Sequence, residues 1–442
     1  MRFLIAPNFA LAYDQRMVRS LARALHHLGH EAKALSAPIE DFALADVCRA
    51  YDPDVVIRVN RFRPLDNPLP PKVRHIAWFQ DVFPETLANI DERIAENDIV
   101  YVLGDPETLG FNVRLPCFVG TLLCGVDETM RPTEAVGLPI DASLCGYIPP
   151  PVYRNPRIAL DLIWYYALPV LKPFERIGFS PTSLITRICN IVPYALTTSL
   201  IGVVEANYQP LCGNLDIHRL TAAMNEIAAT HFGYKQPAGP PKVIKSRLRR
   251  KIYANVMAPY IGSNSEGLGR WGTLQRLMSY LARDYPRLLD RVALIEGILS
   301  VSNSLELYGP GWSEHPQFRQ YYKGTLDSSA DLANVFGRSR LNLANNTHGL
   351  GLHSRTLECM AVGGFIFTHS SPADGKPGGM RTAFEPDVHY GLFTPDTLEE
   401  DARRWLRDEA KRQQAGAKAS AIVRQDHTWT KRAQQILADL RR

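Results

Sequence analysis

The sequence lacks the features that mark several classes of protein. None of its seven cysteines forms a C-x-x-C pair and their number is odd, which argues against a disulfide framework and favours reduced, buried thiols. The net charge of +5 is small for 442 residues and does not indicate a nucleic-acid partner. No charged-then-apolar leader precedes the first predicted strand, so the sequence predicts a cytoplasmic protein rather than a secreted one.

The loop after the first strand also lacks G-x-G-x-x-G, the dinucleotide-binding fingerprint. Apolar runs and helical patterns alternate instead: residues 2–7 predict a strand, 15–28 a helix and 30–35 a second strand. Later apolar runs in DPDVVIRVN, RHIAWFQD and DIVYVLGD predict further strands. Alternating βα units indicate a doubly wound parallel sheet. Because the chain is too long for one hydrophobic core, we expect one domain at 1–135 and a second at 136–442.

The boundary between the domains has two candidate positions. The turn-rich segment CGVDETMRPTEAVGLPIDASLCGY (124–147) predicts a crossing between domains, with the second domain beginning at a strand near 142–146 within it. Residues 256–263 are an alternative first strand. We favour the earlier strand, which leaves a helical insertion at about 150–250.

Two segments of the insertion raise the question of a membrane. The apolar run 188–204 reaches only the lower edge of membrane-spanning length, so it predicts a buried helix in preference to a span. Residues 242–251 hold six basic side chains and predict a solvated helix face. The alternative is attachment to an anionic membrane surface, which would place the protein at the inner face of the membrane.

The strongest local pattern is the stretch 342–368, which reads as a strand, a loop, a short helix, a Gly-Gly break and a second strand. We expect a helix at 354–361 with Ser354 as its N-cap. Helix N-termini at the carboxyl ends of parallel strands favour anions, and Arg355 adds a cationic fork for phosphate oxygens. Glu358, one turn further along, would accept hydrogen bonds from ribose hydroxyls. These residues predict a nucleotide-diphosphate pocket.

The last third of the chain resembles the C-terminal domain of glycosyltransferases of the two-Rossmann GT-B fold, in particular the CgeB-like, spore-maturation-type group. The resemblance rests on LYGPGW, SRLNLANNTHGLGLHSRTLECMAVGGFIFT and RQDHTWTKRAQQIL, and more loosely on GVDETMRP and HIAWFQD nearer the N-terminus. It implies two Rossmann-like domains facing across a cleft, and transfer of a sugar from a nucleotide-diphosphate sugar in polysaccharide or glycoconjugate biosynthesis. The donor-binding residues that it implies are Gly309, Gly311, Ser354, Arg355 and Glu358, and we add Gly349, Gly351 and His353 from the same loop.

We expect no cofactor and no protein-bound metal. Asp52-Pro53-Asp54 matches the D-x-D pattern by which some glycosyltransferases hold a divalent ion, but it is explained by a turn entering the following strand. The expected partner is a nucleotide sugar. The acceptor is open: a glycan, a lipid-linked sugar or a protein.

The catalytic base is the least determined part of the predicted site. Asp81, at the end of a predicted first-domain strand, is our first candidate, with Asp14 and His348 as alternatives. Leu350 stands eight positions before Glu358, where many retaining relatives carry a glutamate, so the contacts to the donor sugar and the stereochemical outcome stay open. Two rival functions follow: a non-catalytic nucleotide-sugar-binding or scaffold protein, and a sugar-nucleotide epimerase.

Overall fold

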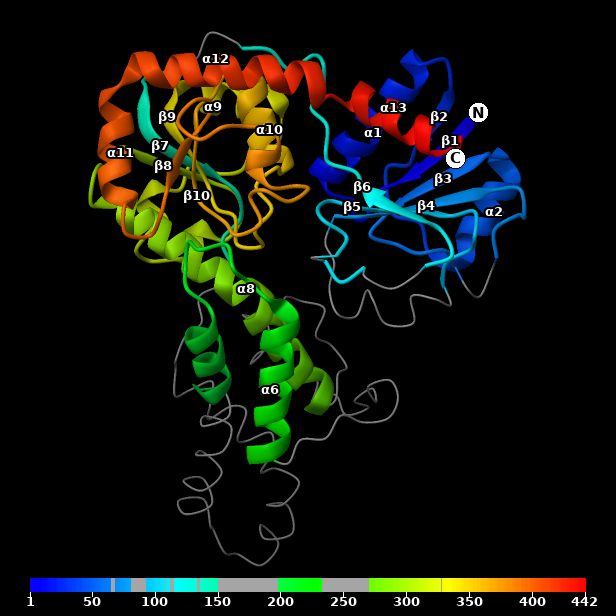
Figure 1. Cartoon of the computed structure of the whole chain (residues 1–442), viewed down its shortest axis with the longest axis horizontal. Helices are drawn as coiled ribbons and strands as arrows, with labels where there is room; N and C mark the ends of the chain where they lie inside the picture. Colours follow the sequence, from blue (N-terminus) through cyan, green and yellow to red (C-terminus); the bar gives the residue numbers. More distant parts are fainter. Residues whose placement is uncertain are drawn as a thin grey trace, which may run out of the picture.

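A computed structural model describes residues 1–64, 68–80, 93–107, 109–111, 115–132, 136–149, 198–232, 270–326 and 328–442. Two α/β units stand side by side, and helices project from the second unit (Figure 1). The alternative strand at 256–263 and the basic stretch 242–251 lie outside the described residues.

The first unit is built on a six-stranded parallel sheet with the order β2-β1-β3-β4-β5-β6. Its strands are β1 (Arg2–Ala6), β2 (Glu31–Ala34), β3 (Val55–Val59), β4 (Arg74–Phe79), β5 (Ile99–Val102) and β6 (Phe118–Thr121). Its helices include α1 (Ala12–His27) and α2 (Asp41–Tyr51). The predicted doubly wound sheet is confirmed, and β6 is a strand that the sequence reading did not anticipate.

The second unit is built on a five-stranded parallel sheet with the order β11-β10-β9-β7-β8. The strands are β7 (Ile140–Cys145), β8 (Leu305–Tyr308), β9 (Ser339–Ala344), β10 (Ile366–His369) and β11 (Gly391–Phe393). The helices around this sheet are α8 (Arg270–Leu299), α9 (Ser329–Arg338), α10 (Ser354–Ala361), α11 (Leu398–Arg407) and α12 (Glu409–Asp426). β7 pairs with both β8 and β9, so the strand favoured by the sequence does belong to the second sheet.

Short 3₁₀ turns follow β8 at Trp312–Glu314 and Arg319–Tyr321, and another lies at Met380–Thr382. The projecting part of the second unit contains a helix over residues 198–207, α6 (Ile217–Phe232) and the first half of α8. Within the described residues, no helix is long and apolar enough to cross a membrane. Of the apolar run 188–204, only 198–204 belongs to the described residues, and there Leu200, Ile201, Val203 and Val204 are buried, as expected for a packed helix.

The last helix corrects the expected extent of the second domain. α13 (Trp429–Asp439) packs against α1 and joins the core of the first unit through Trp429, Ala433 and Ile436. Figure 1 shows α12 leading across to α13, and both chain termini on the first unit. The chain crosses between the units twice, near Val126 and near Thr428, and the two segments run parallel to each other. The backbone N–H of Val126 donates to the carbonyl of His427 at 2.8 Å, and the carbonyl of Val126 accepts from the N–H of Trp429 at 3.1 Å.

The structure also corrects one predicted helix. We expected a single helix at about 397–413, but α11 ends at Arg407 and α12 starts anew at Glu409. The Asp408 carboxylate caps α12 by accepting from the backbone N–H of Lys411 at 2.9 Å. A side chain that satisfies the free N–H groups of a new helix is a start signal that the apolar periodicity alone did not reveal.

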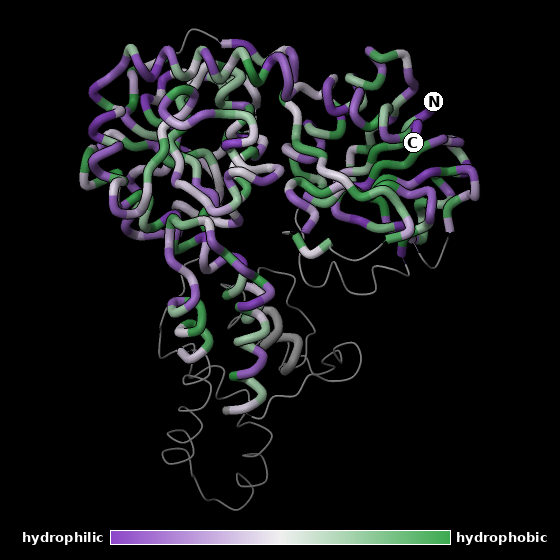
Figure 2. The backbone as a smooth tube through the Cα atoms, viewed as in Figure 1, coloured by the Kyte–Doolittle hydropathy of each residue, from purple (hydrophilic) through white to green (hydrophobic). Residues whose placement is uncertain are grey.

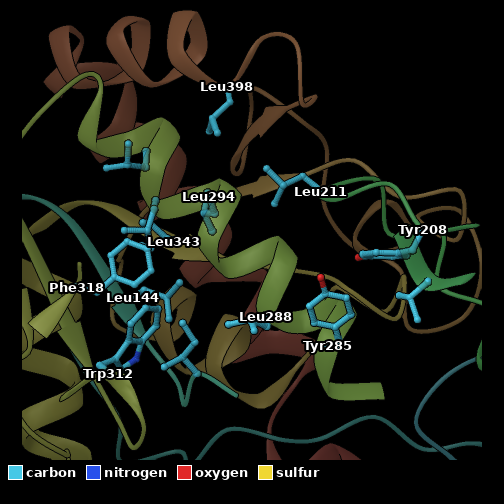
Figure 3. Close-up of a cluster of buried hydrophobic side chains, with 14 of the residues drawn as sticks. Leu144, Tyr208, Leu211, Tyr285, Leu288, Leu294, Trp312, Phe318, Leu343 and Leu398 are labelled. Carbon is cyan, nitrogen blue, oxygen red and sulfur yellow. The ribbon is translucent and has the colours of Figure 1, made fainter. Parts of the chain in front are cut away.

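Each unit has its own apolar core. Hydrophobic residues gather along the strands of the first sheet in Figure 2. In the second unit, Leu144 of β7 and Leu343 of β9 pack with Leu288 and Leu294 of α8 and with Trp312 (Figure 3). α8 is therefore anchored on the sheet by its C-terminal half, which fixes the side chains that it presents near the end of β7.

Candidate functional site

The loop between β9 and α10 carries the predicted donor-binding residues. β9 ends at Ala344 and α10 begins at Ser354, so the loop sits at the carboxyl edge of the parallel sheet. The expected N-cap was wrong: Ser354 is the first helical residue, and His353 occupies the cap position without a side-chain hydrogen bond. The N–H groups of the first helical turn therefore lack a side-chain cap, which leaves the helix dipole available to an anion.

A pocket opens beside this helix start, with about 890 Å³ of empty space, part of it open to solvent. We call it the arginine pocket. Four predicted residues line it, namely His348, His353, Ser354 and Arg355. The end of β7 closes one side through Leu144, Cys145 and Tyr147. The structure thus brings together much of the predicted loop in one concave site.

Two arginines of α8 complete the pocket, and the sequence reading missed both. Arg287 and Arg291 lie one helical turn apart and flank the ring of Tyr147, with guanidinium carbons 5.2 and 5.0 Å from its centroid. Arg291 donates through Nε to Asn345 at 3.0 Å, while its Nη1 is buried without a hydrogen-bond partner among the described residues. The available signal was the i, i+4 spacing of two arginines, but we expected the helix to end near residue 281.

The electrostatics of the pocket are strongly cationic. Burial, and next the neighbouring Arg287, lower the pKa of Arg291 to about 9, so its guanidinium is still charged at neutral pH. Arg355 contributes a third guanidinium from α10, and its side chain is 39% exposed. Three cations around a helix N-terminus form a site suited to a multiply charged anion such as a diphosphate.

The two loop histidines are neutral members of this pocket. His348 Nε2 lies 2.9 Å from Nη2 of Arg287, and since arginine can only donate, the histidine nitrogen accepts. Burial, and next Arg287, hold the pKa of His348 well below its usual value. The pKa of His353 is lowered to about 4 by the same causes in the same order. A base needs a free lone pair, and the Nε2 lone pair of His348 is engaged by Arg287, which argues against its predicted role as catalytic base.

Glu358 faces a different pocket, which lies between the units. This interunit pocket has about 340 Å³ of empty space, part of it open to solvent, and is lined from α1 by Tyr13, Arg16 and Met17 and from α10 by Ser354 and Glu358. Ser354 borders both pockets. A nucleotide whose diphosphate occupied the arginine pocket could therefore direct its ribose past Ser354 towards Glu358.

The predicted glycines have close packing in common. A Cβ on Gly309 would lie 2.7 Å from the backbone of Gly146, and one on Gly311 would lie 2.2 Å from the carbonyl oxygen of Ile148. Both have positive φ, 115° and 92°. These two glycines are thus explained by backbone contact with the end of β7, and they line neither pocket beside Ser354; their predicted contact with the donor stays a prediction.

The glycines of the loop itself pack against its neighbours. Gly349 has a φ of 75°, with Ser371 and Ala373 beside it, and a Cβ on Gly351 would meet Met380 at 2.3 Å. They allow the loop to lie close against residues 371–380, which holds the start of α10 in place.

Leu350 marks a second contact between the units. A Cβ on Gly104, just after β5, would lie 2.6 Å from Leu350 Cδ2, and Lys376 Nζ lies 3.8 Å from the carboxylate of Asp105. Leu350, the position at which the resemblance led us to look for a glutamate, is therefore a buried apolar side chain that faces the first unit.

Part of the chain matches a known protein family. Residues 283–438 match a family model described as "Glycosyl transferase-like". That segment includes Arg287, Arg291, Arg355 and Glu358. No curated protein sequence matches the chain. The match does not single out the CgeB-like group, which stays a prediction.

Several solved structures are similar to this one at low identity. A glycosyltransferase from Rickettsia africae ESF-5 has a TM-score of 0.44 and 10% identity, covering 99% of this chain and 97% of that one. Anabaena HepE in complex with UDP-glucose has a TM-score of 0.47 and 12% identity, covering 100% and 99%. Sucrose-phosphate synthase from Thermosynechococcus elongatus has a TM-score of 0.44 and 12% identity, covering 99% and 98%.

The remaining candidate bases lie away from these pockets or outside the described residues. Asp14 is buried in the first turn of α1 and lines neither pocket, whereas Asp81 falls outside the described residues. Across the described part of the chain, no cluster of three or more His, Cys, Asp or Glu side chains could hold a metal ion. The six described cysteines are free thiols.

Proposed function

We propose that the protein is a glycosyltransferase that moves a sugar from a nucleotide-diphosphate sugar to an acceptor hydroxyl. The observation that carries the proposal is the convergence of Arg287, Arg291 and Arg355 on the free N-terminus of α10. The glycosyltransferase-like match over residues 283–438, which contain all three arginines, supports it.

The reaction breaks the bond between the anomeric carbon and the diphosphate oxygen, and negative charge develops on the departing diphosphate. Fixed cations and helix N–H groups stabilise that charge in the transition state without needing to reorganise. Three guanidinium groups supply the neutralisation for which other enzymes use a divalent ion, so we propose a metal-independent transfer.

The acceptor oxygen forms the new bond to the anomeric carbon and loses its proton to a base. Asp81 remains our first candidate for this base and Asp14 the second. His348 is the weakest of the three because Arg287 occupies its Nε2 lone pair.

One observation favours a second candidate, a nucleotide-sugar-binding protein without transfer activity. At Leu350, where an acidic group would meet the donor sugar in many relatives, the side chain packs against Gly104 of the first unit. Binding of the nucleotide would then persist without catalysis at the sugar.

Incubation with a panel of nucleotide-diphosphate sugars, with and without candidate glycan, lipid-linked and protein acceptors, separates these functions. Acceptor-dependent release of nucleoside diphosphate supports the transferase. Donor turnover without acceptor points to an epimerase, and binding without turnover to the non-catalytic protein. Asp81→Asn at wild-type rate would remove that residue as base.

A further inference from the structure

Arg16 of the first unit reaches the carboxylate of Glu358 in the second. Its Nη2 lies 3.5 Å from Glu358 Oε1, and Arg355 Nη1 lies 3.5 Å from Oε2. The carboxylate is thus held between a cation from its own helix and a cation from α1 of the other unit. Tyr13 of α1 and Ser354 of α10 line the same pocket beside this ion pair, and the partly buried Tyr13 hydroxyl lies 3.7 Å from Cys124 Sγ.

Burial and the two arginines act on the pKa of Glu358 in opposite directions. Its side chain is only 10% exposed, and burial raises its pKa, while Arg355 and Arg16 act in the opposite direction. The other described ionisable groups that face it are neutral or acidic and give no help: Tyr13 of α1, Asp127 of the crossing, Cys145 of β7 and Cys359 of α10.

The carboxylate is also incompletely satisfied. Glu358 Oε2 is buried without a hydrogen-bond partner among the described residues, and the pocket beside it is shared by both units. An ionised carboxylate in this position can accept two hydroxyl hydrogens, which suits the vicinal diol of a ribose.

We propose that Arg16 is a positioning residue of the donor site, which pairs with Glu358 and directs its carboxylate towards the ribose hydroxyls of a bound nucleoside diphosphate. The ribose subsite is then complete only when the two units are in contact. The inference rests on the proposed function, because it takes a nucleoside diphosphate as the ligand.

The test compares the affinities of ADP, GDP and UDP with those of their 2′-deoxy counterparts, by calorimetry between pH 5 and 8. Hydrogen bonds to a charged group give a ribose preference of roughly tenfold or more in the wild-type protein. Arg16→Met raises the pKa of Glu358, since it removes a nearby positive charge. The ribose preference should then fall about tenfold at neutral pH. The pH below which the preference is lost should also rise.

Three variants make the result specific. Glu358→Gln should lack the preference and its pH dependence. Arg16→Lys, which keeps the charge, should restore most of both. Arg19→Met removes an exposed arginine of the same helix, bonded only to Gln15 at 3.0 Å in the contacts described, and should behave as wild type.

Some results would overturn this inference without touching the proposed function. One is a ribose preference in Arg16→Met with the pH dependence of the wild type. Another is equal weakening of binding of the ribo and deoxy forms, which indicates a merely structural contact. Tighter ribose binding in Arg16→Met would also overturn it, because Arg16 would then compete for Glu358. A wild-type protein that binds none of these diphosphates would instead refute the proposed donor site itself.

Discussion

Replacing Arg291 by methionine should make the protein more stable and its donor site inactive. Arg291 lies in the wall of the arginine pocket, nine-tenths buried, with Nη1 unpartnered among the described residues. A buried charge without an ion-pair partner is costly to the free protein and useful only when an anion arrives. Methionine keeps the length and apolar character of the side chain without the charge.

The expected size follows from the pKa of Arg291. Its fall from 12.5 to about 9, caused first by burial and then by Arg287, corresponds to a net cost of about 5 kcal/mol for the charged form, at about 1.4 kcal/mol per unit. Methionine loses the hydrogen bond to Asn345, worth about 1–2 kcal/mol, and the contact with Tyr147, worth about 1 kcal/mol. The free energy of unfolding should therefore rise by about 2 kcal/mol, which moves the melting temperature of a unit of this size up by a few degrees.

Affinity for nucleoside diphosphates should change in the opposite direction. Loss of a charge-assisted contact to phosphate should weaken binding by about 100-fold. Thermal melting and calorimetry with ADP, GDP and UDP measure both quantities, and the stabilisation by ligand should disappear in Arg291→Met. Arg403→Met removes an exposed arginine of α11 paired with Glu399 and serves as control. A variant that melts lower than wild type and still binds diphosphate with full affinity would refute the reasoning.

Three further predictions concern other parts of the molecule. Arg355→Ala should abolish most donor turnover, measured as release of nucleoside diphosphate, and lower the melting temperature by no more than a few degrees, because the side chain is partly exposed but pairs with the buried Glu358 carboxylate; full turnover would contradict the pocket assignment. Gly104→Val should clash with Leu350 and weaken the contact between the units by about 1–3 kcal/mol, which limited proteolysis should show as faster cleavage. Adding Leu350→Ala should relieve the clash and slow the cleavage again. Gly202→Ala, where the added Cβ meets nothing, should leave the cleavage rate unchanged. His427 has its pKa lowered from 6.5 to about 4, first by burial and then by Arg432, so the unfolded chain binds more protons between these values. The melting temperature should fall as pH drops from 6.5 towards 4, and His427→Asn should reduce that slope.

Most secondary structure was predictable because it follows local rules. Apolar runs and helical periodicity located β1, β2 and α10 to within a residue at each end, and the alternation of strands and helices indicated a parallel sheet. The start of α12 was missed because the apolar pattern continues past Asp408, whose side chain caps the new helix. The fate of α13 could not be inferred from its sequence, since an amphipathic helix shows which face is buried but not which sheet buries it.

The sequence by itself determined the helix start at Ser354, the cation at Arg355 and the nearby acid at Glu358, because these three are neighbours along one helix. Only the tertiary structure separated Arg355 and Glu358 into adjoining pockets and supplied each with distant partners. Arg287 and Arg291 come from a helix some sixty residues earlier in the chain, and Arg16 comes from the other unit. Long-range packing brings these distant residues into contact, and it depends on the whole set of core contacts rather than on any local pattern. The loop from β9 to α10 is thus a site that the sequence located and that the fold completed.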